Sequence, residues 1–528
     1  MKEKIKLLVE KSIKELQKEG LFPEFKIPEI SVEKPNDKVY GDYAVNTALA
    51  IVKETKKNPV EIANILSKKI KIKGGKLFGK IEVAGPGFIN FFISEKYLQK
   101  QIGEILKKKE KFSQLKIGKN KKTNIEFISA NPTSPLHVGT ARGAFFGDCL
   151  ANALGKAGYK VSREYYINDS RNSNQIQEMG RTALGRGESY LTPYLKELIL
   201  KLKPHLKKFK SETDAGFFLA QNVLGDIKKF TKEKAKIHFD FWTSEQILFR
   251  EDRVRKIYEF LKAKKLVYEK EGAYWLDMSG FNQKDEVLIR RNGQPTYFLA
   301  DMAYHKHKIE RGFKKLINIW GADHQGHVPR AKAMMKILDY KGDFEVLITQ
   351  IVSFKGKKMS KRKGQIITLE WLIDEVGLDA ARFFYLTKSL DTQMEFDIKL
   401  AKEKSEKSPV FYIQYAHARI CSILKKTKSY KPQVVNYKLL AHSSELVLIK
   451  QLIRFPEIIE ETAKDYQVQR ISQYTVDLAA SFHQFYRDCQ VISEDKELTK
   501  ARLSLILATK LILEDALRLM GISAPEKM

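Results

Sequence analysis

A histidine and a glycine lie where a short apolar segment gives way to a helical pattern. Residues around Ile125 and Phe127 favour a buried strand, and the Asn-Pro and Ser-Pro pairs that follow interrupt regular structure. His137 and Gly139 then open an apolar pattern with helical spacing. A helix N-terminus favours an anion, a histidine can donate to it, and a glycine allows close approach. The pattern predicts a phosphate site, although a His-x-Gly pair alone is explained more simply by a helix cap and a turn.

A second segment, Lys355 to Gly364, is a loop that carries six basic residues within nine positions and follows the apolar run Val346-Leu347-Ile348. A lysine run alone is usually a solvated surface. In a loop between α/β elements, however, mobile cations can close over a polyphosphate. Unspecific attraction to a nucleic-acid backbone is the alternative role.

The two segments together resemble the signature sequences of class I aminoacyl-tRNA synthetases, usually written HIGH and KMSKS. The surrounding sequence is similar to one family of this class, the arginyl-tRNA synthetases, over nearly the whole chain. The matching segments are 129–143, 166–169, 320–324, 414–419 and 521–525. The resemblance implies a ligase that activates L-arginine with ATP, releases pyrophosphate and then esterifies the 2′-hydroxyl of the terminal adenosine of tRNA(Arg).

The resemblance also implies roles for individual residues. The catalytic residues would be His137, Lys358 and Lys361; those binding ATP would be His137, Gly139, Thr140, Met359, Ser360 and Lys361; those binding arginine would be Glu126, Asn131, Tyr297, Asp301 and Asp323; and those binding tRNA would be Tyr412, Gln414, Tyr415 and Arg419. Carboxylates suit arginine because a guanidinium is planar, permanently charged and best held by bidentate oxygen acceptors. The alternatives are a surface or strand-edge role for the two carboxylates and core packing for the tyrosines.

Two positions depart from the family pattern. Thr140 replaces the second histidine of HIGH, and Arg362 replaces the last serine of KMSKS. A hydroxyl is shorter than an imidazole and is never cationic. Either a neighbour such as Arg142 compensates for the missing histidine or the enzyme is slower, and we expect compensation. His324 and Gln325, which follow Asp323, are expected to face the same cleft.

Alternation of strand and helix patterns predicts an α/β fold in which a doubly wound, Rossmann-like parallel sheet forms the catalytic domain. The clearest strand candidates are 161–167, 287–290, 316–320 and 345–348. Helical patterns at about 172–235 and 245–265 fit an insertion. We expect three domains: a small N-terminal α/β domain (1–115), the catalytic domain (116–375) and a C-terminal α-helical bundle (376–528). The family resemblance implies that the N-terminal domain contacts tRNA and that the bundle binds the anticodon.

The composition is strongly basic. The 528 residues include 95 Lys plus Arg against 64 Asp plus Glu, a formal net charge of +31. Such an excess indicates a polyanionic partner, although a lysine-rich composition throughout the chain would also produce it. Cys149, Cys421 and Cys489 are widely spaced, which argues against a disulfide framework or a zinc site.

The expected partners are tRNA(Arg), L-arginine and ATP, with Mg²⁺ implied by ATP chemistry alone and no dedicated metal site visible. We expect a cytoplasmic protein, since the sequence has no signal peptide and no apolar stretch of about 18 residues. The family resemblance implies a monomer. Two other functions stay open. One is a catalytically silent paralogue that only binds tRNA, and the other is a class I synthetase for another amino acid, with cysteine the first candidate.

Overall fold

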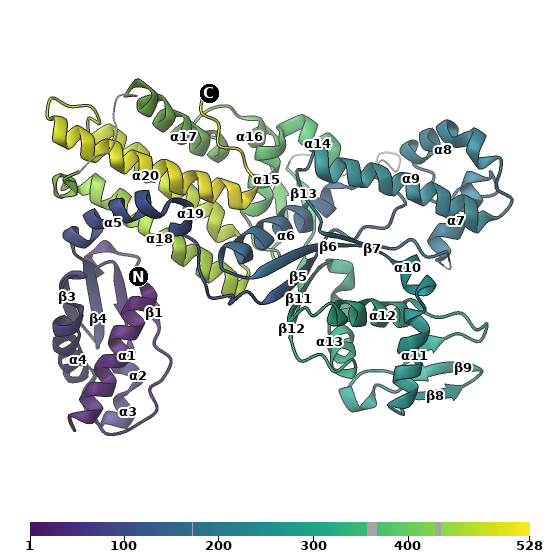
Figure 1. Cartoon of the computed structure of the whole chain (residues 1–528), viewed down its shortest axis with the longest axis horizontal. Helices are drawn as coiled ribbons and strands as arrows, with labels where there is room; N and C mark the ends of the chain where they lie inside the picture. Colours follow the sequence, from purple (N-terminus) through teal and green to yellow (C-terminus); the bar gives the residue numbers. More distant parts are fainter. Residues whose placement is uncertain (172, 356–366, 428–434) are drawn as a thin grey trace.

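The computed structural model describes residues 1–171, 173–355, 367–427 and 435–528 (Figure 1). A five-stranded parallel sheet in the order β12-β11-β5-β6-β7 lies at its centre. The strands are β5 (Lys122–Glu126), β6 (Lys160–Ile167), β7 (Phe241–Ser244), β11 (Lys315–Gly321) and β12 (Asp343–Thr349). The chain winds to one side of β5 and then to the other, so the topological switch point falls between β5 and β11. The predicted doubly wound sheet is confirmed.

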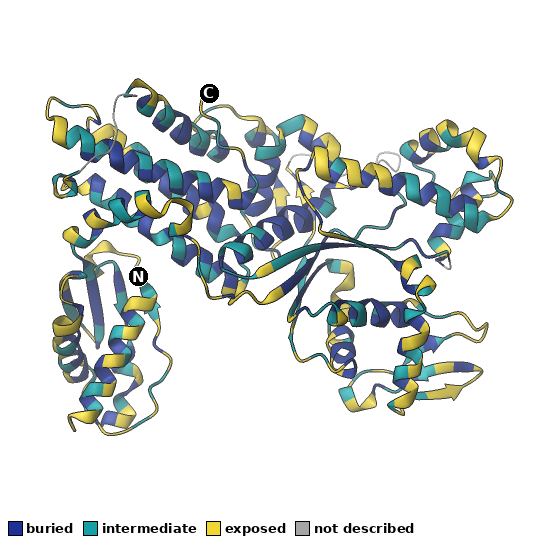
Figure 2. Ribbon diagram, viewed as in Figure 1, coloured by how far each residue is buried: buried dark blue, intermediate teal, exposed yellow. Residues whose placement is uncertain are grey.

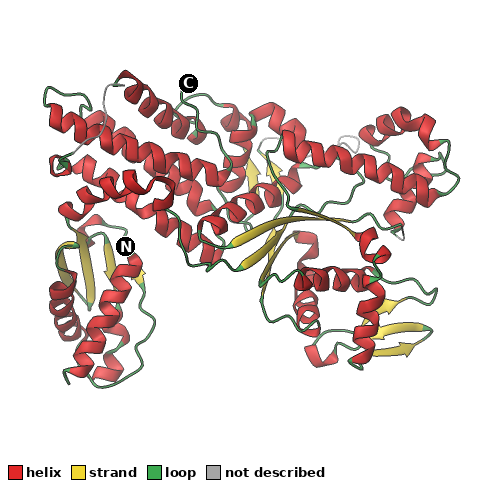
Figure 3. Cartoon of the chain, in the orientation of Figure 1, coloured by secondary structure: helices red, strands yellow, loops and turns green. Residues whose placement is uncertain are grey.

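Helices on both sides of this sheet connect its strands (Figure 3). α6 (Val138–Lys156) follows β5 and is buried along nearly its whole length, and α13 (Val328–Ile337) connects β11 to β12. Between β6 and β7 the chain forms α7 (Asn174–Ala183), α8 (Pro193–Leu206) and α9 (Glu212–Glu233). Two glycines allow α7 and α9 to touch through their backbones. A Cβ at Gly216 would lie 1.8 Å from the carbonyl oxygen of Ile176.

The predicted strand at 287–290 does not belong to the parallel sheet. β10 (Glu286–Ile289) pairs antiparallel with β9 (Ala273–Leu276), which pairs with β8 (Val267–Lys270) in a separate three-stranded sheet. This sheet lies beside α11 (Arg253–Ala263) and α12 (Tyr297–Glu310), after α10 (Glu245–Arg250). The prediction was wrong because a run of four residues can indicate a strand but not its partner.

The N-terminal domain is an antiparallel sheet, in the order β1-β2-β4-β3, covered by helices. Its strands are β1 (Val32–Glu33), β2 (Tyr43–Val45), β3 (Phe78–Ala84) and β4 (Phe88–Ile93), and its helices are α1 (Lys2–Lys18), α2 (Thr47–Ala50), α3 (Val52–Thr55) and α4 (Pro59–Gly74). The helix that follows, α5 (Glu95–Lys108), instead packs on two helices of the C-terminal part, α18 (Ser443–Asp465) and α20 (Lys496–Met520).

The C-terminal part is a helical bundle. Its helices are α14 (Leu369–Val376), α15 (Leu378–Leu386), α16 (Ile398–Lys402), α17 (Pro409–Lys426), α18 (Ser443–Asp465), α19 (Gln469–Asp488) and α20 (Lys496–Met520). The long helices turn buried faces toward one another and exposed faces to solvent (Figure 2). Within the described ranges no helix is long and apolar enough to span a membrane.

A short parallel pair of strands, β13 (Val352–Phe354) and β14 (Met394–Phe396), links this bundle to the catalytic domain. The basic segment therefore follows β13 rather than the strand that contains Val346-Leu347-Ile348, which is β12. The sequence pattern did not indicate either of these three-residue strands.

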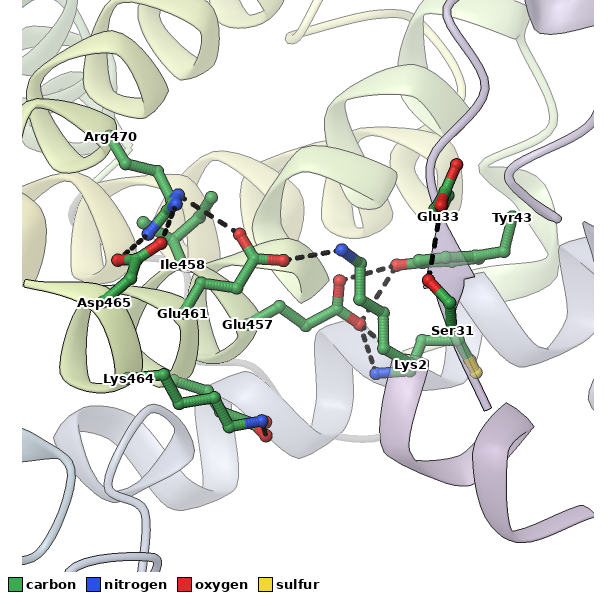
Figure 4. A network of polar contacts seen from close by, with 12 residues as sticks. Lys2, Ser31, Glu33, Tyr43, Glu457, Ile458, Glu461, Lys464, Asp465 and Arg470 are labelled. Carbon is green, nitrogen blue, oxygen red and sulfur yellow. Dashed lines mark hydrogen bonds and ion pairs between the residues drawn. The ribbon is translucent and has the colours of Figure 1, made fainter. Parts of the chain in front are cut away.

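The N-terminal domain docks on α18 through a buried carboxylate, Glu457 (Figure 4). The Tyr43 hydroxyl donates to both carboxylate oxygens, at 3.0 and 3.1 Å, and the backbone N–H of Lys2 donates at 2.9 Å. Lys450 on α18 forms an ion pair with Asp42 at 2.6 Å. These contacts hold the N-terminal domain against the bundle.

A buried arginine, Arg382 on α15, joins three parts of the chain. It forms an ion pair with Asp148 of α6 at 2.9 Å and donates to the carbonyl oxygens of Ala235 at 2.9 Å and Met520 at 3.1 Å. The guanidinium lies so close to Gly521 that a Cβ there would come within 2.2 Å of it. Arg382 thus ties α6 to the end of α9 and to the end of the last helix.

Candidate active site

A cleft of about 770 Å³ opens at the carboxyl ends of β5, β6 and β11. Parallel sheets bind ligands at this edge, beside the switch point. The described residues that were predicted to bind ATP or arginine all line this cleft: Glu126, Asn131, His137, Gly139, Thr140, Tyr297, Asp301 and Asp323. His324 also lines it, whereas Gln325 is not among its lining residues. Lys358, Met359, Ser360 and Lys361 lie outside the described residues.

His137 caps the N-terminus of α6. Its Nδ1 accepts a hydrogen bond from the N–H of Thr140 at 3.3 Å. Desolvation lowers the pKa of His137, so the ring is neutral at pH 7 and carries its proton on Nε2. A Cβ at Gly139 would lie 2.9 Å from the His137 ring, so the glycine leaves room for this position of the ring. The site therefore offers an imidazole donor beside the free N–H groups of a helix.

The segment after the basic loop is hydrogen-bonded to the histidine segment. The N–H of Val138 donates to the carbonyl oxygen of Ile367 at 3.1 Å, and that of Leu369 donates to Leu136 at 2.8 Å. Ile367 directly follows the undescribed segment 356–366. Residues 367–369, which follow the second signature segment in sequence, therefore lie beside the histidine segment.

The two predicted arginine-binding carboxylates differ in their surroundings. Glu126 is buried at the end of β5, where Lys308 donates to Oε2 at 2.5 Å and Ser129 donates to Oε1 at 3.1 Å. Asp301 on α12 remains 40% exposed and accepts from His305 Nδ1 at 3.1 Å. Desolvation would raise the pKa of Asp301, but the nearby His305 and Lys308 outweigh it and lower that pKa. Asp301 is thus an accessible anion, whereas Glu126 already has a cationic partner.

Tyr297 and Asn131 complete the walls near these carboxylates. Tyr297 is 46% exposed and its hydroxyl donates to Ser173 Oγ at 3.0 Å. The side-chain oxygen of Asn131 accepts a hydrogen bond from Asn168 at 2.9 Å.

The lining residues that the sequence analysis did not assign to the site include Tyr166, Glu245, His327 and Arg330. Glu245, the first residue of α10, is only 2% exposed. Burial and the nearby charge of Asp169 raise the pKa of Glu245 to about 8. For Tyr166 the sequence did carry a signal, because this residue lies at the end of a predicted strand and in a segment that resembles the family. No local sequence pattern indicated Glu245.

Arg142 does not face the cleft. It is 1% exposed and donates through Nη2 to the carbonyl oxygens of Ser389 and Thr392, the latter at 2.6 Å. The prediction that Arg142 replaces the missing histidine is therefore wrong. Helical spacing explains the error, because a residue two positions after Thr140 points to a different side of α6.

The predicted tRNA-binding residues lie together on α17, in the bundle. Gln414 donates to Asp379 at 2.8 Å and to the carbonyl oxygen of Ser523 at 3.1 Å, so it anchors the C-terminal segment. Tyr412 packs on His483, with ring centroids 4.4 Å apart. Arg419 donates to the Tyr415 hydroxyl. The two tyrosines and the arginine are partly exposed, as a base-stacking surface requires.

Among the residues whose positions are described, no three His, Cys, Asp or Glu side chains form a group that could hold a metal ion.

A parallel sheet with a His-x-Gly helix N-terminus at its switch point defines the catalytic domain of a class I aminoacyl-tRNA synthetase, and the comparisons agree. The family model described as "tRNA synthetases class I (R), catalytic domain" matches residues 101–175 and 194–420. The "Arginyl tRNA synthetase N terminal domain" matches residues 3–93, and the "DALR anticodon binding domain" matches residues 413–528.

Individual proteins match over the whole chain. An arginine–tRNA ligase of Caldanaerobacter subterraneus subsp. tengcongensis is 42% identical, over 100% of this chain and 99% of that protein. A crystal structure of a putative arginyl-tRNA synthetase from Campylobacter jejuni is 34% identical with a TM-score of 0.73, and covers 83% of this chain and 100% of that one. Thermus thermophilus arginyl-tRNA synthetase, 21% identical, shares the fold over 100% of both chains with a TM-score of 0.81. The chain belongs to the arginyl-tRNA synthetase family.

Proposed function

We propose that this chain activates L-arginine with ATP and transfers it to tRNA(Arg). The observation that carries the proposal is the shared cleft, in which the His137 helix cap and the accessible carboxylate of Asp301 line one cavity. The first site suits a phosphate and the second a guanidinium.

In the first step, a carboxylate oxygen of arginine attacks the α-phosphorus of ATP and pyrophosphate leaves. In the second, the 2′-hydroxyl of the terminal adenosine attacks the carbonyl carbon of the adenylate and AMP leaves. Neither step needs a nucleophile from the protein, so the site acts by positioning and by stabilising charge on the phosphate oxygens. The Nε2–H of His137 and the first N–H groups of α6 are suited to donate to those oxygens.

Lys358 and Lys361 would neutralise the departing pyrophosphate. Support comes from the flank of their segment, where Ile367 accepts a hydrogen bond from Val138 beside His137. Mg²⁺ would enter bound to the phosphates of ATP.

Asp301 would receive the guanidinium, with Tyr297 and Asn131 closing the pocket. Glu126 shares its charge with Lys308 and would supply a second acceptor rather than a free anion. Tyr412, Tyr415 and Arg419 would contact unpaired bases of tRNA, while Gln414 has the structural role described above. Cytoplasmic location and a monomeric state remain predictions.

The test is exchange of labelled pyrophosphate into ATP by the full chain, with and without tRNA(Arg), and with lysine, cysteine and glutamine as control amino acids. We expect exchange with arginine alone. Exchange with another amino acid would assign a different synthetase. Binding of tRNA(Arg) without any exchange would mean that the chain is the silent paralogue.

A further inference from the structure

The segment that follows α20, residues 521–525, lies against α17, and Figure 1 marks the end of the chain close to that helix. We call residues 521–525 the return segment. Its Ile522 is buried, and the N–H of Ser523 donates to Asp379 at 3.0 Å. Gln414 of α17 donates to the carbonyl oxygen of Ser523 at 3.1 Å. A further contact holds the return segment at Pro525, and it is made by a buried histidine of α17.

This histidine, His417, lies between two hydrogen-bond acceptors. The residue is 1% exposed. Its Nδ1 is 2.8 Å from the carbonyl oxygen of Pro525, and its Nε2 is 3.1 Å from Oε1 of Glu514 on α20. A carbonyl oxygen can only accept a hydrogen bond, so Nδ1 must carry a proton to make this contact. The same is true of Nε2 if Glu514 is ionised.

The surroundings of Glu514 keep it ionised. Lys510, one turn earlier on α20, donates to the same carboxylate oxygen at 2.6 Å. The hydrogen bonds from His417 and Lys510 outweigh the effect of burial and lower the pKa of Glu514 to about 2. Glu514 is therefore a carboxylate at neutral pH and can only accept. Both ring nitrogens of His417 thus face acceptors, and the imidazolium ion is the form of the ring that satisfies both.

The other titratable groups near the ring lie on α17, on α20 and just beyond the return segment. On α17, the Cys421 thiol lies 3.8 Å from Nε2, and burial raises its pKa, so the thiol is uncharged at neutral pH. On α20, the ammonium group of Lys510 is paired with Glu514. The exposed Glu526 follows the return segment, and its charge acts on both Cys421 and Lys510. Two carboxylates and one paired cation thus surround the ring, which favours a positive charge on it.

We propose that His417 holds the return segment on α17 as an imidazolium ion and releases it on losing its proton. A neutral ring has one N–H. That proton stays on Nε2, because the charged Glu514 is a stronger acceptor than a carbonyl group. Nδ1 then turns a lone pair toward the oxygen of Pro525, and the two acceptors repel each other. The contact is therefore present at low pH and lost as the pH rises, and it does not depend on the proposed substrate.

The contacts of Ser523 report on this release. They involve Gln414 and Asp379 rather than His417, but they lie only two residues before Pro525. A short segment with few contacts opens more often when one of them is lost. The N–H of Ser523 should therefore exchange with solvent faster once the contact at Pro525 is broken.

The test combines two measurements on the full chain. Selective ¹⁵N labelling of histidine reports the protonation of each ring, and hydrogen–deuterium exchange, corrected for the intrinsic rate at each pH, reports the opening of residues 521–528. We expect both ring nitrogens of His417 to carry protons at pH 6, with the return segment protected. As the ring loses its proton at higher pH, exchange of the Ser523 N–H should become about tenfold faster or more, with the same midpoint.

His417→Gln is uncharged and cannot donate to both acceptors, so its return segment should exchange fast at pH 6 and at pH 9. The titration of wild type gives the answer if this variant is unstable. The matched control is His483→Gln, on α19 of the same bundle. His483 has a single acceptor, the carbonyl oxygen of Tyr412 at 3.3 Å, and burial lowers its pKa. Its ring should be neutral at pH 7, and the variant should protect the return segment as wild type does.

A neutral His417 ring at pH 6 would overturn the inference, and so would equal protection of the return segment in His417→Gln and wild type. It would also be overturned if the ring lost its proton without any change in the exchange of residues 521–528, or if the ring kept its proton up to pH 9.

Discussion

Thr140 is the residue at which this chain departs from its family inside the cleft. Its backbone N–H is used by His137, and its side chain lines the cavity. Arg142 is bound to the carbonyl oxygens of Ser389 and Thr392 and does not face the cleft. The hydroxyl of Thr140 itself is therefore available to replace the second histidine as a donor to phosphate.

Thr140→Val should therefore slow adenylate formation by about 100-fold, since the loss of one donor to a developing oxyanion costs roughly 2.7–4 kcal/mol. Valine keeps the shape and removes only the hydroxyl. The rate of pyrophosphate exchange measures the effect, and Thr140→Ser, which retains the hydroxyl, is the control. An unchanged rate in the valine variant would mean that other groups hold the phosphate.

Glu245 also predicts a pH-dependent stability. Its pKa rises from 4.5 to about 8 on folding, so the stability it contributes is complete below pH 4.5 and is lost as pH rises toward 8. The free energy of unfolding changes by ~1.4 kcal/mol for each unit by which the pKa differs between the folded and unfolded states. We expect the Tm of wild type to fall between pH 5.5 and 8 by more than that of Glu245→Gln, as measured by calorimetry without ligand. If the Tm of wild type and that of Glu245→Gln fell equally with pH, the raised pKa would be contradicted.

At the scale of elements, the insertion between β6 and β7 depends on the backbone contact of α7 with α9. Gly216→Ala would place a methyl group 1.8 Å from a backbone carbonyl, which cannot move without separating the helices. We expect the free energy of unfolding to fall by about 3 kcal/mol or more, which is the cost of severe overpacking. Faster hydrogen exchange across residues 174–233 would report it.

The control lies on the same helix. A Cβ at Gly225 meets nothing within 4 Å, so Gly225→Ala should stabilise α9 by roughly 0.5–1 kcal/mol. If both variants behaved alike, helix propensity rather than close packing would govern the insertion.

The elements that the sequence predicted are those with strong local signals. The strand before His137 and the helix after it follow from an apolar run, two X-Pro turns and a helical period, and these predicted the position of His137 and Gly139. The cleft residues Glu126, Tyr297 and Asp301 were instead predicted from the family resemblance. The partner of β10, the β13–β14 pair and the direction of Arg142 depend on segments far apart in sequence. Glu245 escaped notice because its raised pKa depends on burial and on Asp169 and Asp301, which no local pattern places beside it.

At the scale of the whole molecule, the hydrogen bonds of Tyr43 to Glu457 join the N-terminal domain to the bundle. Tyr43→Phe removes the donor to a buried carboxylate and should lower the stability of the domain contact by about 1.5–3 kcal/mol. We expect a higher KM for tRNA, with the KM for arginine unchanged, in aminoacylation assays.

Tyr40→Phe is the control, since Tyr40 lies three residues earlier in the same domain and is 53% exposed. An unchanged KM for tRNA in Tyr43→Phe would mean that this contact does not affect how the two domains bind their partner.

The contacts of Arg382 bring together residues that the ribosome makes at very different times. Its partners span residues 148 to 520, so Met520 leaves the ribosome only after every residue of the cleft has been made. Until then, a guanidinium destined for the interior lacks one acceptor, and α6, which carries His137 at its start, lacks part of its packing against α20. A chain that stopped before α20 would therefore contain every residue of the cleft but would lack part of the packing of the helix that begins after His137.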